Sequence, residues 1–287
     1  GLSISLPEDF DEDFSLSVSA TAEETDPETG DVTTATSDPV ALDVSVIAQA
    51  DAPTVDVAAA SGDEDTAIAL NIDPAAAAED INGEVTSITI SDIPEGATLT
   101  LPGGITFTAS EGNTSVDLTP AQLEGLTITP PENSDGDFNL TITATAQETD
   151  PETGEVTTAT SDPVSLPVTV EAVADAADLN VSDASGAEDT AIPLTISSEL
   201  TDTDGSETLS VTISGVPAGA SLSAGTDNGD GSWTLTPDQL EGLSITPAAN
   251  SDADFQLTVT ATTTDGTDTT SVSETLDVTV DAVADAP

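Results

Sequence analysis

The feature that most constrains the fold of this chain is a long internal repeat. Residues 1–52 match residues 125–176 at a constant offset of 124, and the two segments differ at only 17 of their 52 positions. A later relative of the same segment, "GLSITPAANSDADFQLTVTAT", begins at Gly242. The same Ala-Asp-Ala motif closes each repeat, at Asp51, Asp175 and Asp285. The chain is therefore expected to be a row of related modules.

The repeat boundaries divide the chain into three parts. Residues 1–52 correspond to the C-terminal part of a module, and residues 53–176 and 177–287 to two complete modules. Both complete modules are close to the size of an immunoglobulin-like sandwich. The sequence starts at Gly1 in the middle of the repeat pattern, so it is expected to be a fragment of a longer chain with its targeting signals elsewhere.

Alternation of apolar and polar residues, the period of a β-strand, runs through each module. In the last module this pattern predicts strands at 179–181, 191–196, 207–214, 220–224, 232–236 with a continuation at 243–247 after a short helical turn, 255–261 and 273–280. Glycine and aspartate turns separate these segments. The predicted fold class is all-β, with tandem seven-stranded Greek-key β-sandwich modules.

Charge sets the chemistry that such modules can use. The chain has 56 Asp and Glu residues and no Lys, Arg or His, so its formal charge is −56. Internal salt bridges are excluded, as is binding to nucleic acid or to an anionic membrane, which needs basic residues. A disordered acidic tail is disfavoured, because 36% of the residues are apolar and regularly spaced. No apolar run is long enough to span a membrane.

Dissolved cations are then the expected counter-charges. Ca²⁺ takes six to eight oxygen ligands, which carboxylates and backbone carbonyls supply. Zinc, copper, haem and iron–sulfur sites are close to excluded, because the chain has neither His nor Cys. The absence of Cys also excludes disulfides, so any external cross-link is expected to be ionic.

Strand order predicts where the acidic loops lie. If the chain enters a module at the top and leaves at the bottom, the A–B and E–F loops lie at the bottom. The B–C, D–E and F–G loops then lie at the top. In the last module the A–B loop is 187–190, the B–C loop 201–207 and the E–F loop 250–255. Acidic loops of two neighbouring modules should therefore meet across each Ala-Asp-Ala linker.

Three sets of calcium ligands follow from this arrangement. At the junction between the second and third modules they are Glu64, Asp65, Asp135, Asp137, Asp175, Asp202, Asp204 and Glu207, with Asp265 or Asp268 added by the F–G turn. The matching half-site at the far end comprises Glu188, Asp189, Asp252, Asp254 and Asp285. The first junction, where "AEDING" replaces "TDTDG", offers Asp11, Asp13, Asp51, Asp80, Asn82 and Glu84. The second junction has enough carboxylates for two or three ions.

These motifs resemble known repeats. The acidic A–B loop, the D-x-D of the B–C loop and the exit "DAVADAP" are similar to the calcium-binding scheme of cadherin repeats. The longer text "GDGSWTLTPDQLEGLSITP…NSDADFQLTVTAT…VADAP" resembles the cadherin-like or Ig-like extender repeats of large, type I secreted bacterial surface adhesins of the RTX type. The resemblance covers all three parts. It implies an extracellular, calcium-rigidified strut of an adhesin, or a self-associating unit of a surface filament or biofilm matrix.

Other interpretations remain open. The acidic loops are also compatible with a solvated surface that keeps an exported protein soluble. A different function class is a ligand-binding module that holds a glycan, ice or a protein on an Ig-like scaffold. Trp233 fits sugar stacking, but its repeat counterpart is Val116 and core packing is favoured; Asp227 and Asp230 are interpreted as a plain hairpin turn. Without His, Lys or Cys there is no base for a nucleophilic triad, so an enzyme is not expected.

Overall fold

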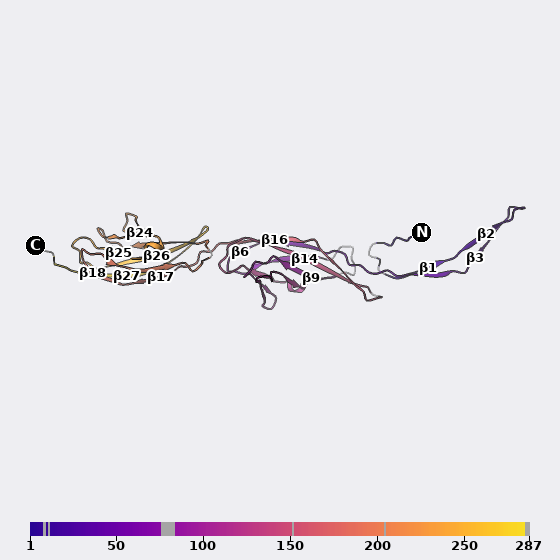
Figure 1. The fold of residues 1–287 in the computed structure, drawn as a ribbon, viewed down its shortest axis with the longest axis horizontal. Helices are drawn as coiled ribbons and strands as arrows, with labels where there is room; N and C mark the ends of the chain where they lie inside the picture. Colours follow the sequence, from indigo (N-terminus) through magenta and orange to yellow (C-terminus); the bar gives the residue numbers. More distant parts are fainter. Residues whose placement is uncertain (8–9, 11, 76–83, 151, 204, 285–287) are drawn as a thin grey trace.

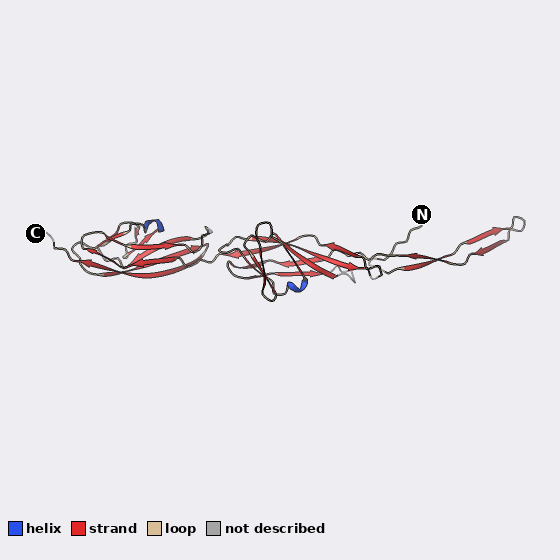
Figure 2. Cartoon of the chain, turned by 60° about the horizontal axis from the view of Figure 1, so that its bottom comes forward, coloured by secondary structure: helices blue, strands red, loops and turns tan. Residues whose placement is uncertain are grey.

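The computed structural model shows an elongated, almost entirely β-structured chain with its three parts in a row (Figures 1 and 2). It describes residues 1–7, 10, 12–75, 84–150, 152–203 and 205–284. The N-terminal part and the C-terminal module lie at opposite ends, with the second module between them (Figure 1). Over these residues, no helix is long and apolar enough to cross a membrane.

The N-terminal part is an interrupted β-hairpin. Its strands are β1 (Phe14–Val18), β2 (Thr21–Thr25), β3 (Val32–Thr36) and β4 (Val40–Val44). β1 pairs with β4 and β2 pairs with β3, both antiparallel. Val40 is 68% exposed, because no other described strand covers this hairpin. Its repeat counterpart Val164 packs against the core of the second module.

The second module is a β-sandwich. Its elements are β5 (Thr54–Ala58), β6 (Ala60–Asp63), β7 (Ile68–Ala69), β8 (Asn71–Ala75), β9 (Glu84–Ser91), β10 (Thr98–Leu101), β11 (Ile105–Thr108), β12 (Val116–Leu118), the 3₁₀ turn η1 (Pro120–Gln122), β13 (Thr127–Thr129), β14 (Phe138–Thr149), β15 (Val156–Thr160) and β16 (Val164–Glu171). One sheet has the order β12-β9-β14-β16-β6, with β15 also paired to β14. The facing strands are β11-β10-β13-β7 and the pair β5-β8. Alternate residues of the long strands form the core between the two layers.

The third module repeats this architecture. Its elements are β17 (Asp178–Ser182), β18 (Ala184–Ala187), β19 (Ile192–Pro193), β20 (Thr195–Glu199), β21 (Thr208–Ser214), β22 (Ser221–Leu222), β23 (Thr226–Asp227), β24 (Ser232–Leu235), η2 (Pro237–Gln239), β25 (Ser244–Thr246), β26 (Phe255–Asp265) and β27 (Asp268–Asp281). The main sheet is β18-β27-β26-β21-β24-β23, and the other layer contains β19-β25-β22 and β17-β20. The predicted all-β sandwich class is confirmed.

One strand prediction is wrong. Residues 232–236 and 243–247 were expected to form one strand E with a helical interruption. Instead β24 pairs with β21 in the main sheet, while β25 pairs with β19 and β22 in the other layer. The turn η2 carries the chain between the layers, with Pro237 in its first turn and Thr236 as its N-cap. Proline cannot continue a strand ladder, so the two segments separate here.

The strand directions that place the four acidic loops agree with the predicted alternation, but the direction of β24 does not. β24 is antiparallel to β21, whereas predicted strand E runs in the same direction as strand C. The D–E turn at 228–231 therefore lies at the end of the module that carries the A–B and E–F loops, and not with the B–C loop as predicted. β26 is antiparallel to both β21 and β27, and β18 is parallel to β27. The A–B and E–F loops therefore share one end of the module, and the B–C and F–G loops share the other. A hydrogen bond from Asn250 N to Asp189 Oδ1 (2.9 Å) ties the first two loops together.

Candidate functional site: the two module junctions

The linker between the second and third modules is held by carboxylates from both sides. Val173 N donates to Glu64 Oε1 (2.8 Å), Ala174 N to Asp268 Oδ2 (3.1 Å) and Asp175 N to Glu207 Oε1 (2.6 Å). Glu64 belongs to the second module, and Asp268 and Glu207 belong to the third. Three successive backbone N–H groups thus bring three carboxylates of different loops around one short segment.

Two of these carboxylates are buried and only half satisfied. Glu64 is 3% exposed and Glu207 is 6% exposed. In each of them Oε1 accepts the linker N–H, while Oε2 is buried and receives no hydrogen bond. An ionised oxygen in this state is costly in a folded protein unless a positive charge lies beside it.

Like charges from the third module increase this cost. Burial raises the pKa of Glu64 to about 7, and the neighbouring Asp265 adds to the rise, while the bond from Val173 N opposes it. Burial also raises the pKa of Glu207, and the charges of Asp202, Asp175 and Asp265 contribute. Asp265 is 1% exposed and Asp202 is 2% exposed. The junction therefore gathers buried acidic groups of two modules in a chain without side-chain cations.

Glu64 belongs to the Glu-Asp-Thr motif of the A–B loop, and the contacts of this loop hold it beside the linker. Glu64 N donates to Glu171 O (3.0 Å), which continues the parallel pairing of β6 and β16 to the linker. A Cβ atom on Gly62 would lie 2.9 Å from Ile68 Cγ1, so glycine allows β6 to approach β7 closely. Thr66 Oγ1 donates to Asp63 O (2.7 Å) and closes the turn.

Two further predicted ligands at this end of the second module, Asp65 and Asp137, accept hydrogen bonds from the backbone of their own module. Asp65, with a positive φ of 53°, accepts a hydrogen bond from Asn133 N (2.9 Å). Asp137 Oδ1 accepts from Val170 N (2.9 Å). Asp135 is half-buried. These contacts tie the A–B and E–F loops to the body of the module.

An open polar hollow of about 370 Å³ lies where the two modules meet. It is lined by Glu132, Asn133, Thr201, Asp202 and Thr203. The E–F loop of the second module therefore faces the B–C loop of the third, as the strand order predicts. The predicted ligand Asp204 lies outside the described residues. Among the residues that are described, no group of three or more acidic side chains forms a ready-made metal site.

These residues nevertheless fit a hard cation. Glu64 Oε2 and Glu207 Oε2 are oxygen atoms, buried and without a donor, and Asp202 and Asp265 lie beside them. Carboxylate oxygen is the ligand type that Ca²⁺ prefers. The structure thus brings together Glu64, Asp175, Asp202, Glu207, Asp265 and Asp268 of the predicted set.

In the described part of the first junction, a buried carboxylate has hydrogen-bond donors for both of its oxygens. Asp150, in the hairpin between β14 and β15, is 2% exposed. Its Oδ2 accepts from Ala48 N (3.2 Å), and its Oδ1 accepts from Thr153 N (2.6 Å), Thr153 Oγ1 (2.8 Å) and Glu152 N (3.0 Å). These bonds, those from Thr153 foremost, lower the pKa of Asp150 to about 2.

Thr157 completes this contact. Ala50 N donates to Thr157 Oγ1 (2.8 Å), and Thr157 Oγ1 donates to Ala48 O (3.3 Å). Asp150 and Thr157 were not among the predicted site residues. The signal for them was available, because the strand order already placed the F–G hairpin "ETDPETGEVT" at this end of the module.

The ligands predicted for the first junction have a different arrangement. Asp13 Oδ1 accepts from Val46 N (2.8 Å), which is the main reason that its pKa is lowered. Contact with Asp13 raises the pKa of Glu152. Asp51 and Glu84 are exposed. Asp11, Asp80 and Asn82 lie outside the described residues.

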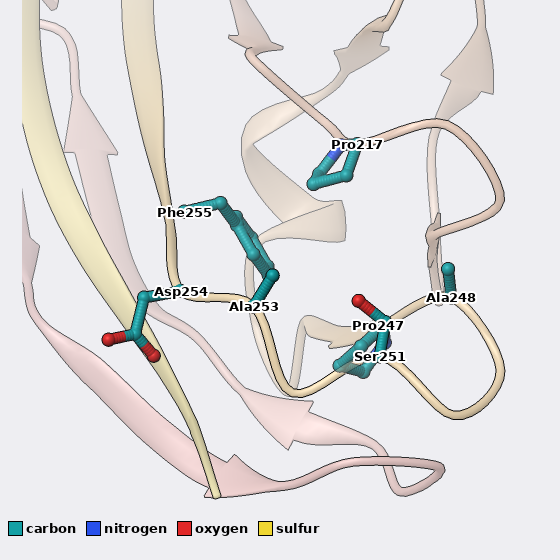
Figure 3. A pocket seen from close by; sticks show the side chains of 7 residues that line it. All are labelled: Pro217, Pro247, Ala248, Ser251, Ala253, Asp254 and Phe255. Carbon is teal, nitrogen blue, oxygen red and sulfur yellow. The ribbon is translucent and has the colours of Figure 1, made fainter. Parts of the chain in front are cut away.

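The far end of the third module repeats the contacts of the second. Glu188 Oε1 accepts from Val283 N (2.7 Å), and Asp254 Oδ1 accepts from Val280 N (2.8 Å). Figure 3 shows Asp254 turned towards β27 and away from Pro217, Pro247 and Phe255, which line an apolar hollow of about 250 Å³. Asp252 is exposed, and Asp285 lies outside the described residues.

Comparisons with known proteins give a likeness of fold only. No family model matches the chain, and no curated protein matches it. A solved structure of Drosophila N-cadherin EC1-4 is similar, with 16% identity, a TM-score of 0.32 and coverage of 94% of this chain and 58% of that chain. The D00-D0 domain of intimin matches with 17% identity and a TM-score of 0.27, over 79% of this chain and 98% of that chain. Titin domains z1z2, in complex with telethonin, match with 10% identity and a TM-score of 0.30, over 82% and 100%.

Proposed function

We propose that this chain is a calcium-rigidified structural repeat, a strut that separates other parts of a large extracellular adhesin. The observation that carries the proposal is the second junction. There, buried carboxylates of two modules share one region, and Glu64 Oε2 and Glu207 Oε2 have no hydrogen-bond donor. A cation bound by these oxygens would join the two modules directly.

The residues that would hold Ca²⁺ have distinct tasks. In Glu64 and in Glu207, Oε1 accepts a hydrogen bond from the linker, and Oε2 would bind the ion. Asp202 and Asp265 supply further charge, and Asp268 holds the linker through Ala174 N. The ion supplies the positive charge that the chain lacks. Without it, mutual repulsion of these carboxylates opposes the closed junction.

The strut role follows from the repetition and the shape. Residues 1–52 and 125–176 have nearly the same sequence, so the chain repeats one kind of module. The modules lie in a row (Figure 1). Such a chain adds length, and rigid junctions keep that length extended. We place it outside the cell, on a bacterial surface, as a non-enzymatic unit. Self-association into a filament or biofilm matrix is a second use of the same unit.

Small-angle X-ray scattering in calcium and in chelator tests this proposal. With millimolar calcium the chain should have one well-defined long dimension, and in EGTA that dimension should be lost. Magnesium should substitute poorly, since it demands a tighter octahedral site. An unchanged scattering profile would rule out calcium closure of the junction, and equal responses to both ions would indicate general screening.

A further inference from the structure

The two complete modules differ in the segment that follows β10 or β22. In the second module β11 pairs with β10, so it joins the layer that contains β13 and β7. β12 and its counterpart β24 both pair with the main sheet, on β9 and β21, but in the third module β23 pairs with β24 and extends that sheet by one more strand. A local change of this kind, on one repeat only, is what a binding function on a repeated scaffold requires.

Trp233 lies on β24, next to this additional strand. It pairs with Ile213 on one side and with Asp227 on the other, so the three side chains share one face of the sheet. Ile213 is fully buried, which identifies this as the core face. Trp233 is half-buried at its open edge and packs partly against the core.

Beside Trp233 is an open hollow of about 520 Å³ with a mainly polar lining. Trp233, Asp227 and Asp230 line it together with the turns 216–220 and 229–231. Asp227 Oδ1 accepts from Gly229 N (2.8 Å), and Asp230 Oδ1 accepts from Ser232 N (3.0 Å) and Ser232 Oγ (2.6 Å). These bonds fix both carboxylates in place and leave Oδ2 of each for a ligand hydroxyl.

We propose that this hollow binds a neutral carbohydrate. A sugar ring offers an apolar C–H face that packs on indole and hydroxyl groups that donate to carboxylates. The formal charge of −56 disfavours acidic glycans. A mainly polar hollow with one aromatic side chain is a poor site for a wholly apolar ligand.

The competing explanation is that Trp233 only seals the edge of the core. In the second module Phe107 and Val116 are partly buried against the core, and Trp233 occupies the position of Val116. Closing the edge of the core requires the indole of Trp233 but neither Asp227 nor Asp230. The two explanations therefore differ in whether Asp227 and Asp230 matter.

Fluorescence gives a direct test, because Trp233 is the only Trp and the chain has no Tyr. The whole chain is titrated with lactose, maltose, cellobiose and mannobiose while its emission is recorded. We expect a saturable shift with at least one sugar, with a Kd of about 1 mM, which is usual for a small open site. Asp227→Asn with Asp230→Asn should weaken that binding at least tenfold without changing the melting temperature.

The matched control is Asp56→Asn with Asp73→Asn, an exposed cross-strand pair on β5 and β8 of the other module. It removes the same charge and should leave sugar binding unchanged. Trp233→Val, which installs the residue of the second module, should abolish binding measured by calorimetry. No saturable shift with any of the four sugars, or equal affinity in the Asp227 and Asp230 variant, would overturn the proposal in favour of a seal only.

Discussion

The two junctions hold equivalent linkers by different chemistry. Ala48 and Ala50 of the first linker correspond to Ala172 and Ala174 of the second, and the F–G hairpin of the following module contacts both linkers. At the first junction the buried carboxylate of Asp150 accepts four hydrogen bonds. At the second junction Glu64 Oε2 and Glu207 Oε2 are buried and accept none. Both oxygens of Asp150 thus have donors, whereas one oxygen of Glu64 and one of Glu207 have none.

Hairpin length explains much of this difference. In the second module β14 and β15 pair up to Thr149 and Val156, and Asp150 caps the intervening turn. In the third module β26 and β27 pair up to Asp265 and Asp268, with only two residues between them. The longer turn supplies its own N–H donors to Asp150. The shorter turn has few donors and presents two carboxylates instead.

Calcium removal is expected to have the largest effect and to separate the junctions. Ion binding to the folded state adds RT ln(1 + [L]/Kd), about 2.7 kcal/mol per site at a hundred times Kd. Extracellular calcium modules typically have a Kd of about 10⁻⁴ to 10⁻³ M. Hydrogen exchange in EGTA should therefore accelerate at the amides of Val173 and Asp175 and stay unchanged at Ala48. Equal acceleration at both linkers would abolish the distinction.

Neutralising the two half-satisfied glutamates should stabilise the calcium-free junction and weaken its response to calcium. In Glu64→Gln with Glu207→Gln, the second junction loses its repulsion, so the calcium-free chain should melt at a higher temperature than the wild type. The same variant should gain little from added calcium. The control Glu188→Gln changes the equivalent residue at the far end and should keep the wild-type response. A calcium-free variant less stable than the wild type would mean that the repulsion is unimportant.

Acid should act on the two junctions in opposite directions. Without calcium, Glu64 has a folded pKa of about 7, above the 4.5 of the free side chain, so the folded state holds the extra proton. Stability at the second junction should then fall as the pH rises from 4.5 through 7. Asp150 has a pKa of about 2, below 3.8, so its contribution is present above pH 3.8 and is lost as the pH falls through 2.

NMR of the linker amides follows this difference. The amide of Val173 should shift and broaden as the pH rises through 7 in EGTA, while the amide of Ala48 should change only in strong acid. Calcium should move the transition at Val173 to lower pH, because the ion competes with the proton. A transition at Val173 that calcium leaves in place would argue against a bound cation there.

The sequence predicted the fold and the ends of the modules better than the contacts of individual carboxylates. Alternation and repeat length sufficed to predict the sandwich, and strand order sufficed to predict that Glu64 and Glu207 lie at the same linker. The sequence did not predict which carboxylate oxygens accept hydrogen bonds from backbone N–H groups. Asp137 and Asp13 both cap a strand N–H, and composition alone does not distinguish such a cap from a metal ligand. The role of Asp150 could not be predicted from its charge, because it depends on the N–H and O–H donors that the turn brings to its carboxylate.

The smallest effect is expected from the hydroxyl of Thr157. Thr157→Val removes the acceptor of Ala50 N and the donor to Ala48 O but keeps the side-chain volume. It should cost about 1 kcal/mol of stability, the usual net contribution of a buried hydrogen bond. Thr160→Val on the same strand is the control, because Thr160 is exposed and its hydroxyl reaches only Thr145. Differential scanning calorimetry should show the same loss for Thr157→Val in calcium and in EGTA, because we propose that hydrogen bonds, and not an ion, hold the described part of the first junction. A loss that calcium restores would show that the first junction also depends on the ion, and the contrast between the two linkers would then be one of degree.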